Sequence, residues 1–233
     1  MKLKALIFDV DGTLADTEEA HRCAFNQAFQ QHGLNWNWSK REYAELLKTA
    51  GGKERLGAYI DAAPLTPDER RVMTERISVL HEAKTDNYTR MVRQGLVPLR
   101  EGVARLIDEA AGAGVRLGIA STTTPRNVDA LLRTNLGPGA LQLFSIIGAG
   151  DQVARKKPAP DIYEFVLREL GEPPEHCVAV EDSAIGLKSS RAAGLITLVT
   201  PSYWTRDEDF SAADWVLPSL GKLDLQDLKQ RFE

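Results

Sequence analysis

Residues 3–13, LKALIFDVDGT, join a short apolar run to a turn that carries two acidic side chains. The run over residues 3–10 is rich in strand formers and ends at the turn signal Asp11-Gly12, which is typical of a buried parallel strand. Residues two apart on an extended backbone share a side, so Asp9 and Asp11 can face one site. Carboxylates this close repel each other unless a cation or hydrogen bonds stabilise them. The segment predicts the first strand of a sheet and a candidate site at its end; a simple strand-ending turn is the alternative.

The chain after this strand has a helical pattern. Apolar spacing predicts a helix over residues 16–31, and Gly33 ends the pattern. Two capping boxes, residues 39–42 (SKRE) and 66–69 (TPDE), mark further helix starts. No convincing strand lies between residues 17 and 90, so we expect this part to be a helical insertion.

After residue 98, helical stretches alternate with short apolar runs, which is the pattern of βαβ units. The fold class predicted is therefore α/β, a doubly wound parallel sheet with an inserted small all-helical cap. The expected catalytic core covers residues 1–16 and 91–233, and the cap covers residues 17–90. Ligands bind at the carboxyl ends of the strands in such sheets. Strands are expected at residues 115–120, 144–147, 177–180, 196–199 and, more weakly, 215–217, with helices at 102–111, 126–132, 160–170 and 184–193.

Three further polar groups follow predicted strands. The hydroxyl of Ser121, with Thr122 behind it, could hold a phosphate oxygen or only cap the next helix. Lys157 could neutralise a phosphate or a carboxylate, or lie in solvent. Glu181 and Asp182 offer the oxygen ligands that Mg²⁺ prefers, although Asp182 could instead cap a helix. Each signal is weak alone, but all fall at one sheet edge with complementary charges, so together they predict a phosphate site with a metal ion.

The composition excludes several classes of protein. Twenty-nine Lys and Arg against 33 Asp and Glu give a net charge of −4 without a basic block, which argues against a nucleic-acid partner. No apolar run reaches the roughly 18 residues that span a bilayer, and the start lacks a signal-peptide pattern. Cys23 and Cys177 lack metal-type spacing, so we expect two reduced thiols. A cytoplasmic monomer without a membrane partner is expected.

Taken in order, DVDGT, Ser121, Lys157-Pro158 and Glu181-Asp182 resemble the four motifs of the haloacid dehalogenase superfamily of phosphotransferases. The resemblance covers nearly the whole chain, and the insertion corresponds to that superfamily's small cap. DVDGTLADTE, KKPAPDIY and EDSAIGLKSSRAAG are most similar to the branch that contains phosphoglycolate phosphatase, β-phosphoglucomutase and the CbbY proteins. GGKERL and STTTPRNV are most similar to the CbbY group. This implies a phosphatase for a small phosphorylated sugar, xylulose 1,5-bisphosphate, and a place in the Calvin cycle.

The same resemblance implies a role for each core residue. Asp9 would be the nucleophile that forms an aspartyl phosphate, and Asp11 would be the general acid and then the base for water. Mg²⁺ would be bound by Asp9, Asp182 and the backbone carbonyl of Asp11, with Glu181 nearby. Lys157 would offset the negative charge of the reacting groups, and the catalytic set is completed by the hydroxyl of Ser121.

Substrate selectivity is expected to come from the cap. Glu18 and His21 match positions that face the site in related enzymes. Two glycines before Lys53 and Arg55 let the backbone pass close to a ligand, so these two cations could hold a second phosphate. A solvated helix start is the alternative. The full set of predicted substrate-binding residues is Glu18, His21, Tyr43, Lys53, Arg55, Thr122 and Arg126.

Other functions share part of this pattern. A signalling receiver domain also uses an Asp, a hydroxyl and a Lys around Mg²⁺, but it lacks the inserted helices. A dehalogenase needs no general acid for a phosphate ester, and Asp11 is present here. A β-phosphoglucomutase-like phosphomutase shares every core motif, and a phosphoglycolate phosphatase differs only in its substrate. Both alternatives stay open at the level of sequence.

Overall fold

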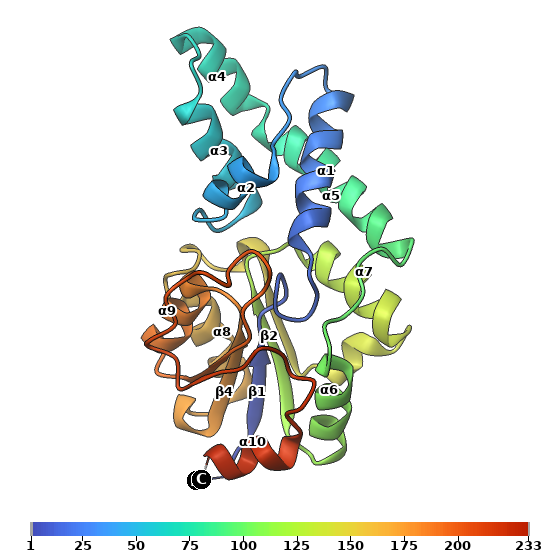
Figure 1. Cartoon of the computed structure of the whole chain (residues 1–233), viewed down its shortest axis with the longest axis vertical. Coiled ribbons are helices and arrows are strands. Elements are labelled where there is room, and N and C mark those ends of the chain that lie inside the picture. The colour runs from blue at the N-terminus through green and yellow to red at the C-terminus, as the bar shows by residue number, and fades with distance from the viewer. Residues whose placement is uncertain (1, 233) are drawn as a thin grey trace.

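The computed structural model describes residues 2–232, which form a six-stranded sheet below a layer of helices (Figure 1). The strand order is β3-β2-β1-β4-β5-β6, and every pair is parallel. The predicted fold class, a doubly wound parallel sheet with a helical cap, is confirmed. The strands are β1 (Ala5–Phe8), β2 (Arg116–Ser121), β3 (Ile146–Ala149), β4 (Cys177–Glu181), β5 (Ile196–Val199) and β6 (Trp215–Val216).

The central strand β1 is shorter than the predicted strand over residues 3–10. The amide of Asp9 still bonds to the carbonyl of Val180, but the chain then turns, because the amide of Leu14 bonds back to the carbonyl of Val10. Asp9 and Asp11 therefore follow a strand that has neighbours on both sides. This places their side chains in the middle of the carboxyl edge.

Successive residues of β1 supply two different cores, as the alternation of a strand requires. Leu6 and Phe8 belong to one apolar cluster, and Ala5 and Ile7 belong to another on the opposite face. The first face is covered by α6 (Val103–Gly112), α7 (Pro125–Leu136) and α10 (Leu225–Phe232), and the second by α8 (Asp161–Leu170) and α9 (Ala184–Ala192).

Helix α10 was not predicted from the sequence. Its buried residues Leu225, Leu228 and Phe232 have helical spacing, but they occupy only eight residues of an otherwise polar segment. Short 3-10 turns also escaped prediction; they lie at η1 (Ala140–Leu143), η2 (Gly150–Gln152) and η3 (Pro174–His176).

A layer of helices lies above the sheet, and we call this layer the cap (Figure 1). Both predicted capping boxes are present, in the turns that begin α2 and α4. An aromatic cluster that includes Phe25, Phe29 and Trp38 gives the cap an apolar core separate from the two cores of the sheet. The cap helices are α1 (Glu18–Gln31), α2 (Lys40–Leu46), α3 (Gly52–Ala62), α4 (Pro67–Glu75) and α5 (Ile77–Arg93).

Two boundaries of the cap differ slightly from the expected ones. Helix α1 begins at Glu18 and not at residue 16, and α5 runs to Arg93, past the boundary expected at residue 90. Between residues 2 and 232, no helix combines the length and apolarity needed to traverse a bilayer.

Truncation of Leu6 to alanine is expected to lower the free energy of unfolding by about 2–5 kcal/mol, because Leu6 is fully buried at the centre of the sheet. The measurement is urea denaturation followed by circular dichroism. Val72→Ala on the exposed side of α4 is the matched control and should stay within about 0.5 kcal/mol of the parent. Equal losses in both variants would contradict the assignment of the core.

Candidate active site

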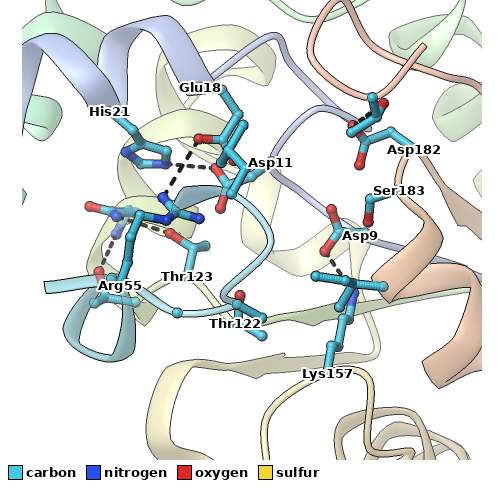
Figure 2. Close-up of a pocket in the computed structure, with 18 of the residues that line it drawn as sticks. Asp9, Asp11, Glu18, His21, Arg55, Thr122, Thr123, Lys157, Asp182 and Ser183 are labelled. Atoms are coloured by element: carbon cyan, nitrogen blue, oxygen red, sulfur yellow. Dashed lines mark hydrogen bonds and ion pairs between the residues drawn. The ribbon is translucent and has the colours of Figure 1, made fainter. Parts of the chain in front are cut away.

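A cavity opens between the carboxyl edge of the sheet and the cap (Figure 2). Parallel strands bring their ends together here, so residues as far apart as Asp9 and Lys157 share one wall. The sheet side contributes Asp9, Asp11, Thr122, Thr123, Thr124, Lys157, Asp182 and Ser183 to the lining, and the cap contributes Glu18, His21, Gly51, Gly52, Arg55, His81 and Lys84.

Asp9 lies on the sheet side of the cavity and is 7% exposed. Lys157 Nζ donates to Asp9 Oδ1 at 2.8 Å and to Glu181 Oε1 at 2.6 Å, and Tyr163 donates its hydroxyl proton to the same Glu181 oxygen at 2.6 Å. Burial lowers the pKa of Lys157, but the two carboxylates outweigh burial and hold the pKa above its ordinary value. Lys157 is therefore a permanent cation that links Asp9 to Glu181.

Three buried carboxylates surround one point at this end of the sheet. Oxygens of Asp9, Glu181 and Asp182 all lie within 4.8 Å of one another. Burial, with the repulsion of Glu181 and Asp11, raises the pKa of Asp9 to about 7 although Lys157 opposes the rise. Burial and the charges of Asp9 and Glu181 also raise the pKa of Asp182. One lysine thus leaves negative charge uncompensated, and an all-oxygen donor set of this kind fits a hard divalent cation such as Mg²⁺.

Gly12 allows the turn after β1 to approach this cluster. Its φ is +83°, a backbone conformation that residues with a Cβ rarely adopt. An ideal Cβ at this position would lie only 2.1 Å from Asp182 Oδ2. The DVDG pattern therefore requires glycine for both its backbone conformation and its closeness to Asp182.

Asp11 has a different environment from Asp9. Its Oδ1 accepts hydrogen bonds from the Thr17 hydroxyl at 2.7 Å and from His21 Nε2 at 2.8 Å. Burial raises the pKa of Asp11, but His21, Thr17 and Lys84 outweigh it and hold the pKa well below its ordinary range. The side chain of Asp11 is thus committed to the cap side, so a contribution to a metal ion would come from its backbone carbonyl.

His21 is neutral in this arrangement. Burial and the nearby charge of Lys84 lower its pKa, although Asp11 opposes them. Nδ1 of His21 is buried without a hydrogen-bond partner, which a neutral ring carrying its proton on Nε2 accounts for. His21 therefore acts as a hydrogen-bond donor that orients the carboxylate of Asp11.

The cap side of the cavity is organised around Tyr43. The Tyr43 hydroxyl donates to Glu18 Oε2 at 2.7 Å and accepts from an Arg55 guanidinium nitrogen at 2.8 Å. The Arg55 side chain also donates to the carbonyl of Leu46. Glu18 and Arg55 border the cavity, whereas Tyr43 is fully buried behind them.

Lys84 and His81 line the cavity but were not predicted from the sequence. Lys84 Nζ lies 5.0 Å from the ring centroid of Phe25, and burial lowers the pKa of Lys84 to about 8. Their segment of the chain reads as an ordinary amphipathic helix. The sequence showed only a histidine and a lysine three residues apart on one face of a helix. This pattern is common in solvent-exposed helices, so it did not point to a binding site.

Other predicted residues lie outside this cavity. Lys53 Nζ pairs with Asp151 Oδ2 at 2.8 Å and lines an adjoining cavity. Arg126 pairs with Asp86 at 2.5 Å on the surface. Ser121 is buried, and its Oγ accepts the amide proton of Thr123 at 3.2 Å. The sheet edge thus presents Thr122 to the cavity with Ser121 behind it.

A family model described as haloacid dehalogenase-like hydrolase matches residues 3–194. The chain belongs to this family. The first motif of the sequence, the strand-end cluster and the cap all lie within the matched segment. The predictions of the family and of a phosphatase enzyme are confirmed by this match and by the relatives below.

Similar proteins cover almost the whole chain. Protein CbbY of Rhodobacter capsulatus is 53% identical over 94% of this chain and 95% of its own length. A CBBY-like protein of Arabidopsis thaliana is 44% identical over 93% of this chain and 69% of its own length. A crystal structure of CbbY from Rhodobacter sphaeroides in complex with phosphate has a TM-score of 0.89 and 46% identity, and covers 97% of this chain and 99% of that chain. A mutant of the same CbbY was solved in complex with xylulose-(1,5)bisphosphate, with a TM-score of 0.90, 45% identity and the same coverage.

Replacement of Lys157 by methionine is expected to lower the free energy of unfolding of the metal-free protein by about 3–5 kcal/mol near pH 8, because two buried carboxylates lose their shared cation. The pKa of Asp9, already raised in the parent, then lies further above its unfolded value because Lys157 no longer opposes the rise. The loss should therefore be largest at high pH and shrink as the pH falls and the carboxylates bind protons.

Urea denaturation in EDTA at pH 5.5 and pH 8 checks this dependence. Lys156→Met, which removes the neighbouring lysine paired with Asp151, is the matched control. A loss that is independent of pH would show that Lys157 does not compensate the cluster.

Proposed function

We propose that the protein is a Mg²⁺-dependent phosphatase that hydrolyses a small sugar bisphosphate, xylulose 1,5-bisphosphate, through an aspartyl phosphate on Asp9. The observation that carries the proposal is the position of Asp9, whose carboxylate is held by Lys157 inside a buried acidic cluster and borders the cavity. The complex of a related CbbY with xylulose-(1,5)bisphosphate supports the choice of substrate.

In the first step, an oxygen of Asp9 attacks phosphorus, and the bond from phosphorus to the sugar oxygen breaks. Asp11 gives a proton to the departing sugar oxygen. In the second step, Asp11 takes a proton from water, whose oxygen attacks the same phosphorus and releases inorganic phosphate and Asp9. Each step transfers one proton through Asp11, so the residue ends the cycle in the state in which it began.

The surroundings of Asp11 suit the second step directly. Thr17 and His21 stabilise its ionised form, which is the form that accepts a proton from water. For the first step, the dianionic phosphate of the substrate must raise the pKa of Asp11 so that it carries a proton. The two hydrogen bonds also fix the carboxylate in position for both transfers.

Mg²⁺, when bound by Asp9, Asp182 and the Asp11 carbonyl with Glu181 nearby, would reduce the repulsion between an anionic carboxylate and an anionic phosphate. Lys157, which donates to Asp9 Oδ1, serves the same purpose. Thr122 and the amides after β1 are the groups of the sheet edge available to orient phosphoryl oxygens.

The second phosphate of the substrate is assigned to the cap. Arg55 and Lys84 are buried cations that border the cavity. Among residues 2–232, Glu18 is the one carboxylate of the cap that lines the cavity with them. Desolvated cations bind a phosphate dianion strongly because water competes little. Glu18 would accept hydrogen bonds from sugar hydroxyls, with Tyr43 holding it in place. Lys53 is not assigned to the second phosphate, because it pairs with Asp151 and lines the adjoining cavity.

We further propose that residues 1–16 and 91–233 act as the catalytic core and residues 17–90 as a cap that admits and releases substrate. With xylulose 1,5-bisphosphate as its substrate, the enzyme would act in the Calvin cycle as a cytoplasmic monomer.

Replacement of Asp9 by asparagine is expected to abolish phosphate release, because the amide cannot form the aspartyl phosphate. The assay measures inorganic phosphate in Mg²⁺ from xylulose and ribulose 1,5-bisphosphates, phosphoglycolate and β-glucose 1-phosphate. Asp16→Asn, at a mostly exposed carboxylate near the same strand, is the control and should keep parental activity. Turnover by the Asp9 variant above background would refute the nucleophile. Isomerised sugar phosphate as the main parental product would identify a phosphomutase instead.

Replacement of Arg55 by alanine is expected to lower kcat/KM for the bisphosphate by roughly 10- to 150-fold, the loss typical of a hydrogen bond to a charged group. The loss for the corresponding monophosphate should be much smaller. Lys53→Ala is the matched control and should change both substrates alike, because Lys53 lies outside the main cavity. Thermal melting checks that the Arg55 variant is folded, and Arg55→Lys provides a conservative comparison. An unchanged preference for bisphosphates would remove Arg55 from the phosphate site.

A further inference from the structure

Residues 202–205, in the loop after β5, touch both the cap and the acidic cluster. Neither the motifs of the sequence nor the mechanism above gives this segment a role. Thr205 lines the cavity beside Asp182, and its neighbour Trp204 packs against the aromatic cluster of the cap. Two adjacent residues therefore face the two parts of the active site.

Thr205 holds one oxygen of Asp182. Its hydroxyl donates to Asp182 Oδ2 at 3.2 Å and accepts the amide proton of Ser202 at 2.9 Å. Thr205 is 7% exposed and Asp182 is 3% exposed, so water has little room to replace the contact. Groups that hydrogen-bond to ligating carboxylates fix their orientation toward the ion.

Trp204 contacts Tyr43, the residue that organises the cap side of the cavity. Its ring meets that of Tyr43 edge-on, with centroids 5.6 Å apart and an angle of 81° between the planes. Aromatic pairs with this geometry stabilise a protein by more than the burial of their apolar surface alone. Of the aromatic pairs that the structure shows within residues 2–232, this is the one that joins the cap helices to the rest of the chain. Tyr43 in turn holds Glu18 and Arg55.

Both ends of the loop are fixed to the sheet edge. The amide of Thr200 bonds to the carbonyl of Glu181 at 2.8 Å, and Arg100 donates to the carbonyls of Thr200 and Pro201. Beyond the segment, Glu208 accepts the amide proton of Ala184 at 2.6 Å. Because the ends of the loop are fixed, the position of its middle depends on the packing of Trp204 against the aromatic cluster of the cap.

We propose that residues 202–205 couple the cap to the acidic cluster. Thr205 is a positioning residue for Asp182, and Trp204 is the contact with Tyr43 of the cap. When the cap packs on Trp204, Thr205 holds Asp182 in the orientation that binds the ion. When the cap moves away, this support weakens. The inference rests on the proposed function only in taking Asp182 as a metal ligand.

The first test measures the binding of Mg²⁺ alone to the metal-free protein by isothermal titration calorimetry. Thr205→Val keeps the shape but removes the donor, and should weaken binding about 10-fold, the lower end of what loss of such a group costs. Thr205→Ser keeps the hydroxyl and should restore binding to within about twofold of the parent by the same principle. Thr197→Val is the matched control, since Thr197 is also buried and its hydroxyl bonds to that of Ser190 at 2.7 Å, away from the cavity.

The second test asks whether Trp204 acts through Thr205. Trp204→Ala should weaken Mg²⁺ binding, Trp204→Phe should largely keep it, and removal of the exposed neighbouring ring in Tyr203→Ala should leave it unchanged. The double variant Trp204→Ala/Thr205→Val should bind Mg²⁺ no more weakly than Thr205→Val alone, because contacts on one path are not additive.

Parental affinity in Thr205→Val, or equal losses in the Val and Ser variants, would overturn the role of Thr205. Additive losses in the double variant would overturn the coupling. Both results leave the proposed function intact if the parent binds Mg²⁺ and releases phosphate. A parent that does neither would overturn the proposed function and this inference together.

Discussion

Three carboxylates, Asp9, Glu181 and Asp182, are buried together, and a single lysine, Lys157, pairs with only the first two. This imbalance of charge governs the active site. Buried like charges are tolerated only when a cation, hydrogen bonds or protons compensate them. Lys157 compensates part of the charge, but burial and the charges of Glu181 and Asp11 still raise the pKa of Asp9 to about 7. In the proposed function, a divalent cation would neutralise the rest of the cluster and attract the anionic phosphate of the substrate.

The fold brings this cluster together at little cost in local strain. β1 and β4 are neighbours in parallel register, so Asp9 and Asp182, which follow them, meet without any special loop. Gly12 supplies the close approach that the turn needs. The same cavity contains a second acid with the opposite behaviour, since hydrogen bonds from Thr17 and His21 keep Asp11 ionised. Two aspartates only two residues apart thus differ in chemistry because of their surroundings: Asp9 faces the acidic cluster, and Asp11 faces the cap.

The sequence predicted the architecture well because its signals are local. The apolar run before Asp9, the capping boxes at residues 39–42 and 66–69, and the alternation after residue 98 all depend on near neighbours in the chain. It also predicted which core residues converge, since parallel strand ends must share an edge. The weaker result concerned the cap, where the structure brings Arg55 to the cavity but pairs Lys53 with Asp151. Helical phase decides which of two neighbouring cations faces inward, and the exact start of α3 was not evident. Lys84 and residues 202–205 were missed because their importance comes from tertiary contacts alone.

In the proposed mechanism, the carboxylate of Asp9 forms a covalent bond to the phosphoryl group. Acid-quenched mass spectrometry can detect this bond. The parent enzyme is mixed with xylulose 1,5-bisphosphate and Mg²⁺, quenched within a single turnover, digested and mapped. A phosphoryl adduct is expected on the peptide that contains Asp9, present at early time points and lost as inorganic phosphate appears. Phosphate release at the full rate with no adduct on that peptide, or with the adduct on another residue, would contradict this mechanism.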